Sequence, residues 1–283
     1  MAPENKYPIP IEDCWVATDY ILKNPNEFSI DIDHVCLAGD SAGGGVVAVI
    51  TQRLAKDSRK MPKLQILIYP WMQHFDFTLP SYAFQKTSQM VSFGGSSLVK
   101  LILWYLGEMD VSNAMENAVS SNEHVLLIED VETRKKYADC LDSNMIPDIY
   151  KTGKSYYNNY TKFINSELIT SKMSNQSIFK KNLIFANSVK SLFNEDVSPG
   201  LANDELLEKL PKAYVIVCEI DELKDEDIIY AERLRKNGVN VKIAFYENGF
   251  HGMITFIHKD LLNTTASIMV DNLIQYISEN LFD

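Results

Sequence analysis

The stretch Gly39-Asp40-Ser41-Ala42-Gly43-Gly44 decides the fold that we predict for this chain. A short apolar run at 34–38 precedes it, and a pattern typical of a helix follows it through Leu54. A G-x-S-x-G turn between a strand and a helix holds its serine in a tight corner, with small residues around it and the hydroxyl above the sheet. The context therefore predicts a nucleophile elbow in which Ser41 is the nucleophile.

The neighbours of Ser41 have expected roles of their own. Gly39, Asp40 and Gly43 form the elbow, because the turn leaves little space for side chains. The backbone N–H of Ala42 stands at a helix N-terminus, where the dipole favours negative charge on an attacked carbonyl. The sequence thus predicts half of an oxyanion hole at Ala42.

Composition limits the classes of protein to consider. The chain has 283 residues, 46% of them hydrophobic, which suits a single α/β domain with an insertion. Its formal net charge is −11. An acidic chain without a basic run is a poor candidate for binding nucleic acid or an anionic membrane surface. We therefore expect its partner to be a neutral small molecule.

Neither a membrane span nor a signal peptide is predicted. The longest apolar stretch, Leu98 to Leu106, is interrupted by Lys100 and is too short to cross a bilayer. The N-terminus opens on Ala2-Pro3-Glu4-Asn5-Lys6, without the apolar segment of a signal peptide. We expect residues 1–283 by themselves to be soluble.

We expect no metal and no cofactor. The four cysteines are widely separated, no C-x-x-C is present, and the histidines do not cluster. Three N-x-S/T triplets begin at Asn159, Asn175 and Asn263, and each could carry a glycan in the secretory pathway. Such triplets also arise often by chance.

Hydrophobic patterns place the elbow in a parallel sheet. Apolar runs, typical of strands covered on both faces, occur at 34–38, 64–69 and 213–218, and a further strand is predicted at 241–246. Helical patterns occur at 11–22, 42–54, 225–236 and 268–281. Their alternation predicts an α/β fold with right-handed crossovers. We expect Pro10 to keep Ile9 out of the helical region, so that residues 1–10 are extended.

The long interval between the second and third strands predicts an inserted helical cap. We divide the chain into a core segment with the elbow at 1–84, the cap at 85–205 and a core segment with the other catalytic residues at 206–283. One apolar helix face of the cap comprises Leu98, Leu101, Ile102, Tyr105 and Leu106. Either this face packs on the cap's own core, or it lines an acyl or aryl pocket.

Acid candidates follow the third predicted strand. Asp221 lies three residues beyond Cys218, where open α/β sheets gather catalytic groups. Asp225 and Glu226 fall in the first turn of the next helix, where carboxylates stabilise the helix dipole without a catalytic role. We therefore predict Asp221 as the catalytic acid.

The base is predicted from the loop expected at 248–252, after the last strand. Of five histidines only His251 stands between glycines at such a position. The resulting order of serine, acid and histidine is the order that this fold uses. We predict that His251 takes the Ser41 proton and returns it to the leaving group, while Asp221 orients and stabilises the imidazolium.

Several segments together carry a resemblance to a known family. They are Ala2-Pro3-Glu4, Tyr7-Pro8-Ile9-Pro10, Gly39 to Gly44, Tyr69-Pro70, Asp221-Glu222-Leu223-Lys224-Asp225, Tyr230-Ala231-Glu232-Arg233-Leu234 and Phe250-His251-Gly252. In these segments the chain resembles the hormone-sensitive-lipase group of α/β-hydrolases, most closely its arylacetamide deacetylase and neutral cholesterol ester hydrolase branch. The resemblance covers roughly 1–85 and 198–283, and the cap matches only loosely.

The resemblance implies a serine carboxylesterase or lipase-type hydrolase that acts on lipophilic esters, or on arylamides, through an acyl-enzyme at Ser41. Such proteins are often held by an N-terminal membrane anchor, with the catalytic domain in the endoplasmic reticulum lumen. In that setting the three triplets would be glycosylation sites. The alternative is a non-catalytic hydrolase-fold protein that encloses a small apolar ligand. The presence of His251 argues against it, because a receptor needs no base.

The chain departs from the family pattern at its start. Family members carry a His-Gly-Gly-Gly motif upstream of the Ala-Pro-Glu segment, and residues 1–283 begin at that segment. We therefore expect the anchor, the N-terminal strands and the oxyanion glycine loop to be missing from these residues. Removing one oxyanion donor costs on the order of 3–4 kcal/mol, so we expect little or no turnover from residues 1–283 alone.

Overall fold

The computed structural model describes residues 2–87, 95–151, 169–257 and 263–282. Its strands form one parallel sheet in the order β1-β2-β3-β4. Their bounds are Cys36–Asp40 for β1, Leu64–Ile68 for β2, Lys212–Ile220 for β3 and Val241–Phe250 for β4. Gly39 lies opposite Leu67, which in turn lies opposite Val215. The carboxyl ends of the strands therefore meet at one edge of the sheet, as predicted for a parallel α/β fold.

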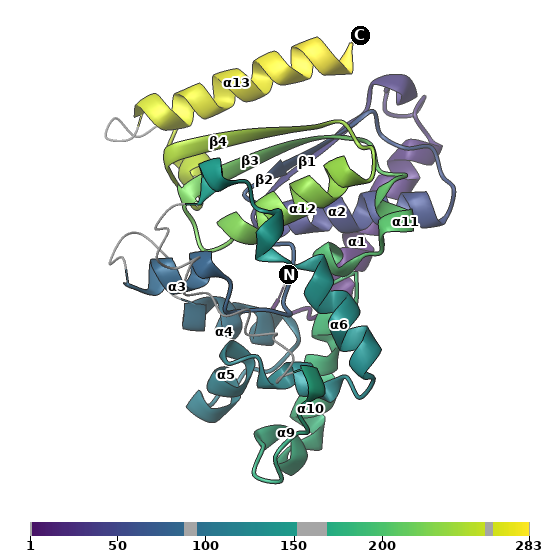
Figure 1. Ribbon diagram of the computed structural model, residues 1–283. Coiled ribbons are helices and arrows are strands. Elements are labelled where there is room, and N and C mark those ends of the chain that lie inside the picture. The colour runs from purple at the N-terminus through teal and green to yellow at the C-terminus, as the bar shows by residue number, and fades with distance from the viewer. Residues whose placement is uncertain (1, 88–94, 152–168, 258–262, 283) are drawn as a thin grey trace.

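Helices cover both faces of this sheet (Figure 1). α2 (Ala42–Lys56) and α12 (Lys224–Lys236) lie on one face, and α13 (Asn263–Leu281) lies on the other. Successive side chains of β3 point to opposite faces. Val215 packs in the cluster with α2 and α12, whereas Ile216 packs in the cluster with α13. This burial on both sides explains why the two inner strands, β2 and β3, are predominantly apolar.

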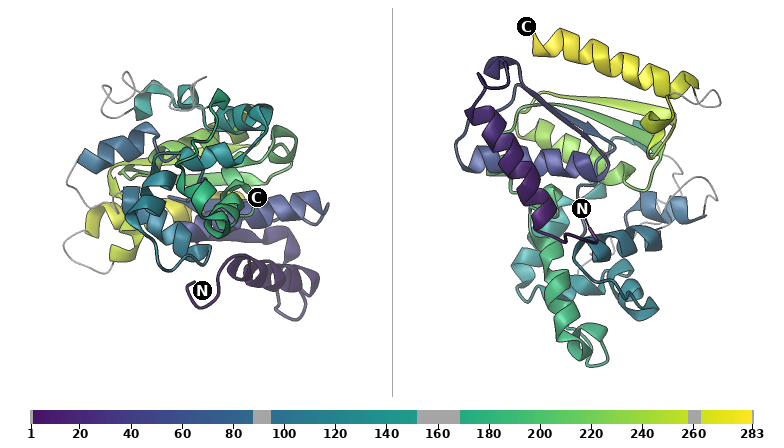
Figure 2. Two further views of the ribbon diagram at one scale, coloured as in Figure 1. Left: turned by 90° about the horizontal axis from the view of Figure 1, so that it is seen from below. Right: turned by 180° about the vertical axis from the view of Figure 1, so that it is seen from behind.

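A helical layer lies on the α12 side of the sheet, between β2 and β3 in the chain (Figure 2). Its helices are α3 (Pro80–Thr87), α4 (Gly95–Tyr105), α5 (Asn113–Ser120), α6 (Val131–Cys140), α9 (Ile178–Lys181), α10 (Leu183–Val189) and α11 (Asp204–Leu207). The described part of this interval contains no strand. Val119 and Phe185 belong to the same apolar cluster as Val47 and Val215, so the helical layer shares its core with the sheet. The limits 85–205 remain a prediction.

Two local predictions were wrong. α1 (Ile9–Lys23) begins at Ile9, because Pro10 falls in the first turn, where a missing N–H costs nothing. β4 continues through Phe250, although we expected a loop from 248. The ladder resumes after an irregularity near Cys218 and pairs Phe250 with Ile220. No helix in the described ranges is long and apolar enough to cross a bilayer.

Candidate active site

Ser41 joins β1 to α2 in a strained backbone conformation. Its φ is 55° and its ψ is −124°, a region that costs a non-glycine residue about 1–3 kcal/mol. Neighbouring segments hold it there. The Ser41 N–H donates to the carbonyl of Ile68 at 2.9 Å, and the Ser41 carbonyl accepts from the N–H of Trp71 at 3.0 Å. The end of β2 and the segment after it therefore fix the position of the serine.

The glycines of the elbow differ in how tightly they are packed. A Cβ at Gly39 would lie 2.3 Å from the carbonyl oxygen of Gly43. A Cβ at Gly44 would lie 2.6 Å from the Cβ of Pro70. At Gly43, by contrast, an added Cβ would meet no atom within 4 Å. The fold therefore needs glycine at 39 and 44, whereas position 43 of the motif has space for a side chain.

Ser41, His251 and Asp221 lie in one chain of hydrogen bonds. The Oγ of Ser41 is 2.8 Å from the Nε2 of His251. The Nδ1 of His251 is 2.9 Å from Oδ2 of Asp221, whose other oxygen accepts the N–H of Leu223 at 2.9 Å. Asp221 is 2% exposed. The structure thus brings together the three residues that the sequence places on separate strand ends, at 41, 221 and 251.

The charge of Asp221 sets the electrostatics of His251. Burial disfavours the imidazolium, but the Asp221 carboxylate and its hydrogen bond, with Asp40 and Glu222, outweigh burial. The pKa of His251 is therefore raised above the usual 6.5. The ring of Tyr69, packed 5.0 Å from the imidazole between centroids, restricts its movement. A base held in this way can accept a proton from Ser41 near neutral pH.

The acidic run after Asp221 has partners that the sequence did not reveal. Glu226 accepts the N–H of Met72 at 2.7 Å, the N–H of Gln73 at 3.2 Å and the side-chain amide of Gln73 at 2.8 Å. The hydroxyl of Tyr82 lies 3.0 Å from the same carboxylate. Glu226 lies in the first turn of α12, as predicted, and these hydrogen bonds give it a structural role that its helix position did not suggest. It joins α12 to the segment that follows β2.

Asp225 makes a second connection of the same kind. Its carboxylate accepts the N–H of Ser81 at 2.8 Å, and the Ser81 hydroxyl donates to the carbonyl of Glu222 at 2.6 Å. These bonds fix the turn that carries Asp221. A separation of 144 residues along the chain hides such contacts from sequence reasoning.

Asp227, the next acidic residue, differs sharply from Glu226. It is 0% exposed, and within the described structure neither carboxylate oxygen has a hydrogen-bond partner. Burial, followed by the negative charges of Asp221 and Glu226, raises the pKa of Asp227 well above 3.8. Burial also raises the pKa of Glu226 to about 8. The surroundings of Asp227 therefore favour its neutral form.

Ala42 is the first residue of α2 and is exposed. The N–H groups of a helix's first turn have no acceptor within the helix, so this N–H is available to an oxyanion. Asp40 ends β1 on the other side of Ser41. Both residues therefore lie where the sequence analysis placed them.

The predicted apolar face of the cap packs inward. Leu98 and Ile102 of α4 are 4% and 3% exposed and belong to the main core cluster. Tyr105 packs against Tyr7 with tilted rings whose centroids are 5.8 Å apart. Leu101, at 41%, points to the surface. Of the two alternatives, packing in the core fits this helix, and the pocket does not.

Of the three asparagine side chains predicted to carry glycans, the structure describes that of Asn175. Asn159 and the side chain of Asn263 lie outside the described residues, although Asn263 is the first residue of α13. Asn175 is exposed, and its side-chain oxygen accepts a hydrogen bond from the Nζ of Lys180 at 2.8 Å. Glycosylation of all three stays a prediction.

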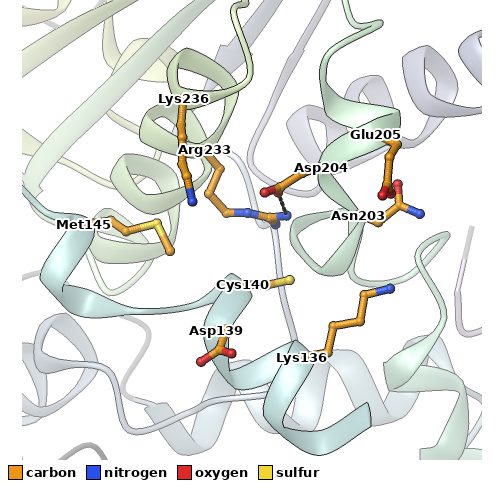
Figure 3. A pocket seen from close by; sticks show the side chains of 9 residues that line it. All are labelled: Lys136, Asp139, Cys140, Met145, Asn203, Asp204, Glu205, Arg233 and Lys236. Atoms are coloured by element: carbon orange, nitrogen blue, oxygen red, sulfur yellow. Dashed lines mark hydrogen bonds and ion pairs between the residues drawn. The ribbon is translucent and has the colours of Figure 1, made fainter. Parts of the chain in front are cut away.

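A cavity of about 300 Å³ lies between α6, α11 and α12, and none of Ser41, Asp221 and His251 lines it (Figure 3). Residues of both charge signs line it, and Arg233 is committed to Asp204 at 2.7 Å and to the carbonyls of Gly200 and Ala202. Its lining comprises Lys136, Asp139, Cys140, Met145, Asn203, Asp204, Glu205, Arg233 and Lys236. Pockets for lipophilic molecules are mostly apolar, so this cavity does not suit an ester substrate. In the described ranges, no three His, Cys, Asp or Glu side chains are grouped to hold a metal.

Comparison with protein families agrees with this architecture. The model of the family described as "alpha/beta hydrolase fold" matches residues 1–128 and 147–255. The arylacetamide deacetylase of Oryctolagus cuniculus is 32% identical over 260 residues, which cover 90% of this chain and 58% of that protein. The neutral cholesterol ester hydrolase 1 of Mus musculus is 32% identical over 263 residues, which cover 90% of this chain and 58% of the relative.

Among solved structures, a thermostable carboxylesterase cloned from a metagenomic library superimposes with a TM-score of 0.62 at 20% identity. The match covers 100% of this chain and 67% of the esterase. At this identity the likeness concerns the fold alone. The chain spans about three fifths of the length of the curated relatives that it matches, 58% and 61% for two of them.

Proposed function

Because the chain belongs to the α/β-hydrolase fold family, we propose that it contributes the catalytic triad of a serine hydrolase that cleaves carboxylic esters. The observation that carries this proposal is the hydrogen-bonded chain from Ser41 Oγ through His251 to Asp221, with contacts of 2.8 and 2.9 Å. A binding protein would need no such chain. The raised pKa of His251 also supports a base that works near neutral pH.

In the proposed reaction Ser41 attacks the ester carbonyl while its proton passes to Nε2 of His251. The Nδ1–H of His251 donates to Asp221, whose charge stabilises the imidazolium as it forms. The Ala42 N–H binds the oxyanion of the tetrahedral intermediate. His251 then gives its proton to the leaving alcohol, and the Ser41 acyl ester forms. Water, activated by His251, releases the acid and restores Ser41.

The substrate class that we propose is the lipophilic carboxylic ester, with arylamides as the second choice. Its basis is the similarity to proteins named arylacetamide deacetylase and neutral cholesterol ester hydrolase 1. By the same similarity we propose placement in or at the endoplasmic reticulum, where Asn159, Asn175 and Asn263 would meet the glycosylation machinery.

A fluorophosphonate probe tests the proposed function, because it reacts with a serine activated by a base and does not depend on turnover. We expect the probe to label the wild-type chain once, at Ser41. Labelling should fall to background in Ser41→Ala and by at least about a hundredfold in His251→Ala. Ser58→Ala serves as the control, because Ser58 is exposed and, like Ser41, has a positive φ (49°). Equal labelling of wild type and Ser41→Ala would refute the assignment.

A further inference from the structure

The helical layer carries an unusual stretch at 169–194. It contains four lysines and no aspartate or glutamate, in a chain whose net charge is −11. We refer to residues 172–190, which include α9 and α10, as the tip. Figures 1 and 2 show α9 and α10 at the end of the molecule opposite α13. A partner can therefore approach the tip without meeting the sheet or its covering helices.

α9 and α10 divide their apolar residues between inside and outside. Phe179 and Phe185 are buried and stack with ring centroids 5.3 Å apart. The turn between the helices is fixed by Asn182, whose side chain accepts the N–H of Phe185 at 3.0 Å. As a result Leu183 and Ile184, at the start of α10, are 68% and 82% exposed. No large apolar side chain in the described ranges is more exposed than Ile184.

The lysines beside these two residues keep their charge open to a partner. Lys180 donates to the side chain of Asn175 at 2.8 Å, and Lys181 donates to that of Gln176 at 2.8 Å. Both acceptors are neutral amides. Among the described ion pairs, none involves any of the tip lysines, which are exposed and stand at 172, 180, 181 and 190. Elsewhere, exposed lysines do have acidic partners, as Lys23 has in Asp19 at 2.6 Å.

We propose that the tip docks on an anionic phospholipid surface. Leu183 and Ile184 would enter the interface between headgroups and acyl chains, and the lysines would contact the lipid phosphates. The remaining surface of an acidic protein is repelled by such a membrane, so this positive, apolar end sets the orientation of docking. The contact is peripheral and does not depend on catalysis. The net charge of the chain does not reveal this positive surface, because acidic residues elsewhere outnumber the tip lysines.

The proposal conflicts with one predicted modification. Asn175 accepts a hydrogen bond from Lys180 and therefore lies within the docking surface. A glycan on Asn175 would hold Leu183 and Ile184 away from the bilayer. The tip that docks is therefore one in which Asn175 is unmodified.

Vesicle flotation tests the proposal on the full chain, produced without glycosylation. We expect binding to vesicles of equal parts phosphatidylcholine and phosphatidylserine, and none to phosphatidylcholine alone. Lys180→Gln with Lys181→Gln should lower the partition coefficient about thirtyfold, at about fivefold for each lysine near an anionic surface. Leu183→Ser with Ile184→Ser should lower it at least about tenfold.

Ile268→Ser with Ile274→Ser is the matched control, because these α13 residues are 51% and 60% exposed at the other end of the molecule. It should bind as the wild type does. The proposal is overturned if the wild type ignores anionic vesicles, if either tip variant binds fully, or if the control loses as much binding as the tip variants. A tip that binds another protein and no vesicle would also overturn it. Ester hydrolysis plays no part in this measurement, so its outcome is independent of the proposed function.

Discussion

Glu226 accepts the backbone N–H of Met72 at 2.7 Å, across 154 positions of the chain. This bond joins α12, the helix after Asp221, to the segment after β2, the strand that pairs with β1. Glu226 and its neighbour Asp227 are both buried carboxylates of α12, yet only Glu226 has hydrogen-bond donors around it in the described structure. Substituting Glu226 should therefore lower the free energy of unfolding, whereas substituting Asp227 should raise it.

Glu226→Ala should destabilise the protein by at least about 3 kcal/mol, because it leaves the buried N–H groups of Met72 and Gln73 and the hydroxyl of Tyr82 without an acceptor. Denaturant unfolding measures the change. Glu132→Ala provides the control, since the Glu132 side chain is 78% exposed. That control should change stability by less than about 0.5 kcal/mol. A Glu226→Ala effect as small as the control's would show that the hydrogen bonds contribute little.

Asp227→Ala should stabilise the protein, and more so at high pH. A buried acid whose folded pKa is raised favours folding below its unfolded pKa of 3.8 and opposes folding as pH rises toward its folded pKa. Removing it should therefore gain about 1–3 kcal/mol at pH 8 and less at pH 5. Unfolding free energies at the two pH values measure this. Destabilisation at both would mean that Asp227 has a partner.

The elbow glycines supply a matched pair of substitutions. Gly39→Ala places a methyl group 2.3 Å from the Gly43 carbonyl oxygen, so the turn must open and probe labelling of Ser41 should be lost. Gly43→Ala meets no atom within 4 Å and lies in the first turn of α2. It should preserve labelling of Ser41. It should also increase the stability of the protein by less than about 1 kcal/mol, because alanine favours the helical conformation more than glycine does. Equal loss in both variants would contradict this difference.

The sequence predicted most of this site because its signals are local. A G-x-S-x-G turn between a strand and a helix, Asp221 beyond one strand and His251 beyond the next were enough to predict the residues that meet. The parallel sheet likewise followed from the apolar runs. The limits of β4 did not, because its pairing at Phe250 follows a register shift in which β4 advances from Tyr246 to Phe250 while β3 advances from Cys218 to Ile220.

Long-range packing explains what the sequence could not predict. Asp225 and Glu226 satisfy the N–H groups of a segment about 150 residues earlier, and helix position alone suggests nothing of this. Whether Gly43 needs to be glycine depends on the space around it, which the motif does not record. The exposure of Leu183 and Ile184 depends on how α9 and α10 pack through Phe179 and Phe185.

Asp221→Asn should change the pH dependence of the reaction as well as its rate. His251 must be neutral to act as a base, and its pKa is raised because the Asp221 charge outweighs burial. The rate of fluorophosphonate labelling in the wild type should therefore rise with pH through a value above 6.5. In Asp221→Asn only the weaker contributions of Asp40 and Glu222 oppose burial, so the rise should move to lower pH, and the plateau should fall at least about a hundredfold. An unmoved pH profile would contradict the role of Asp221.

The most direct test of the central claim is to find the acyl group itself. The wild-type chain is incubated with p-nitrophenyl acetate, quenched in acid and digested, and the peptides are sequenced by mass spectrometry. We predict one acetyl ester, on the oxygen of Ser41, and none in Ser41→Ala. Acetylation that is absent from Ser41, or equally strong at other residues in both proteins, would contradict a nucleophilic Ser41.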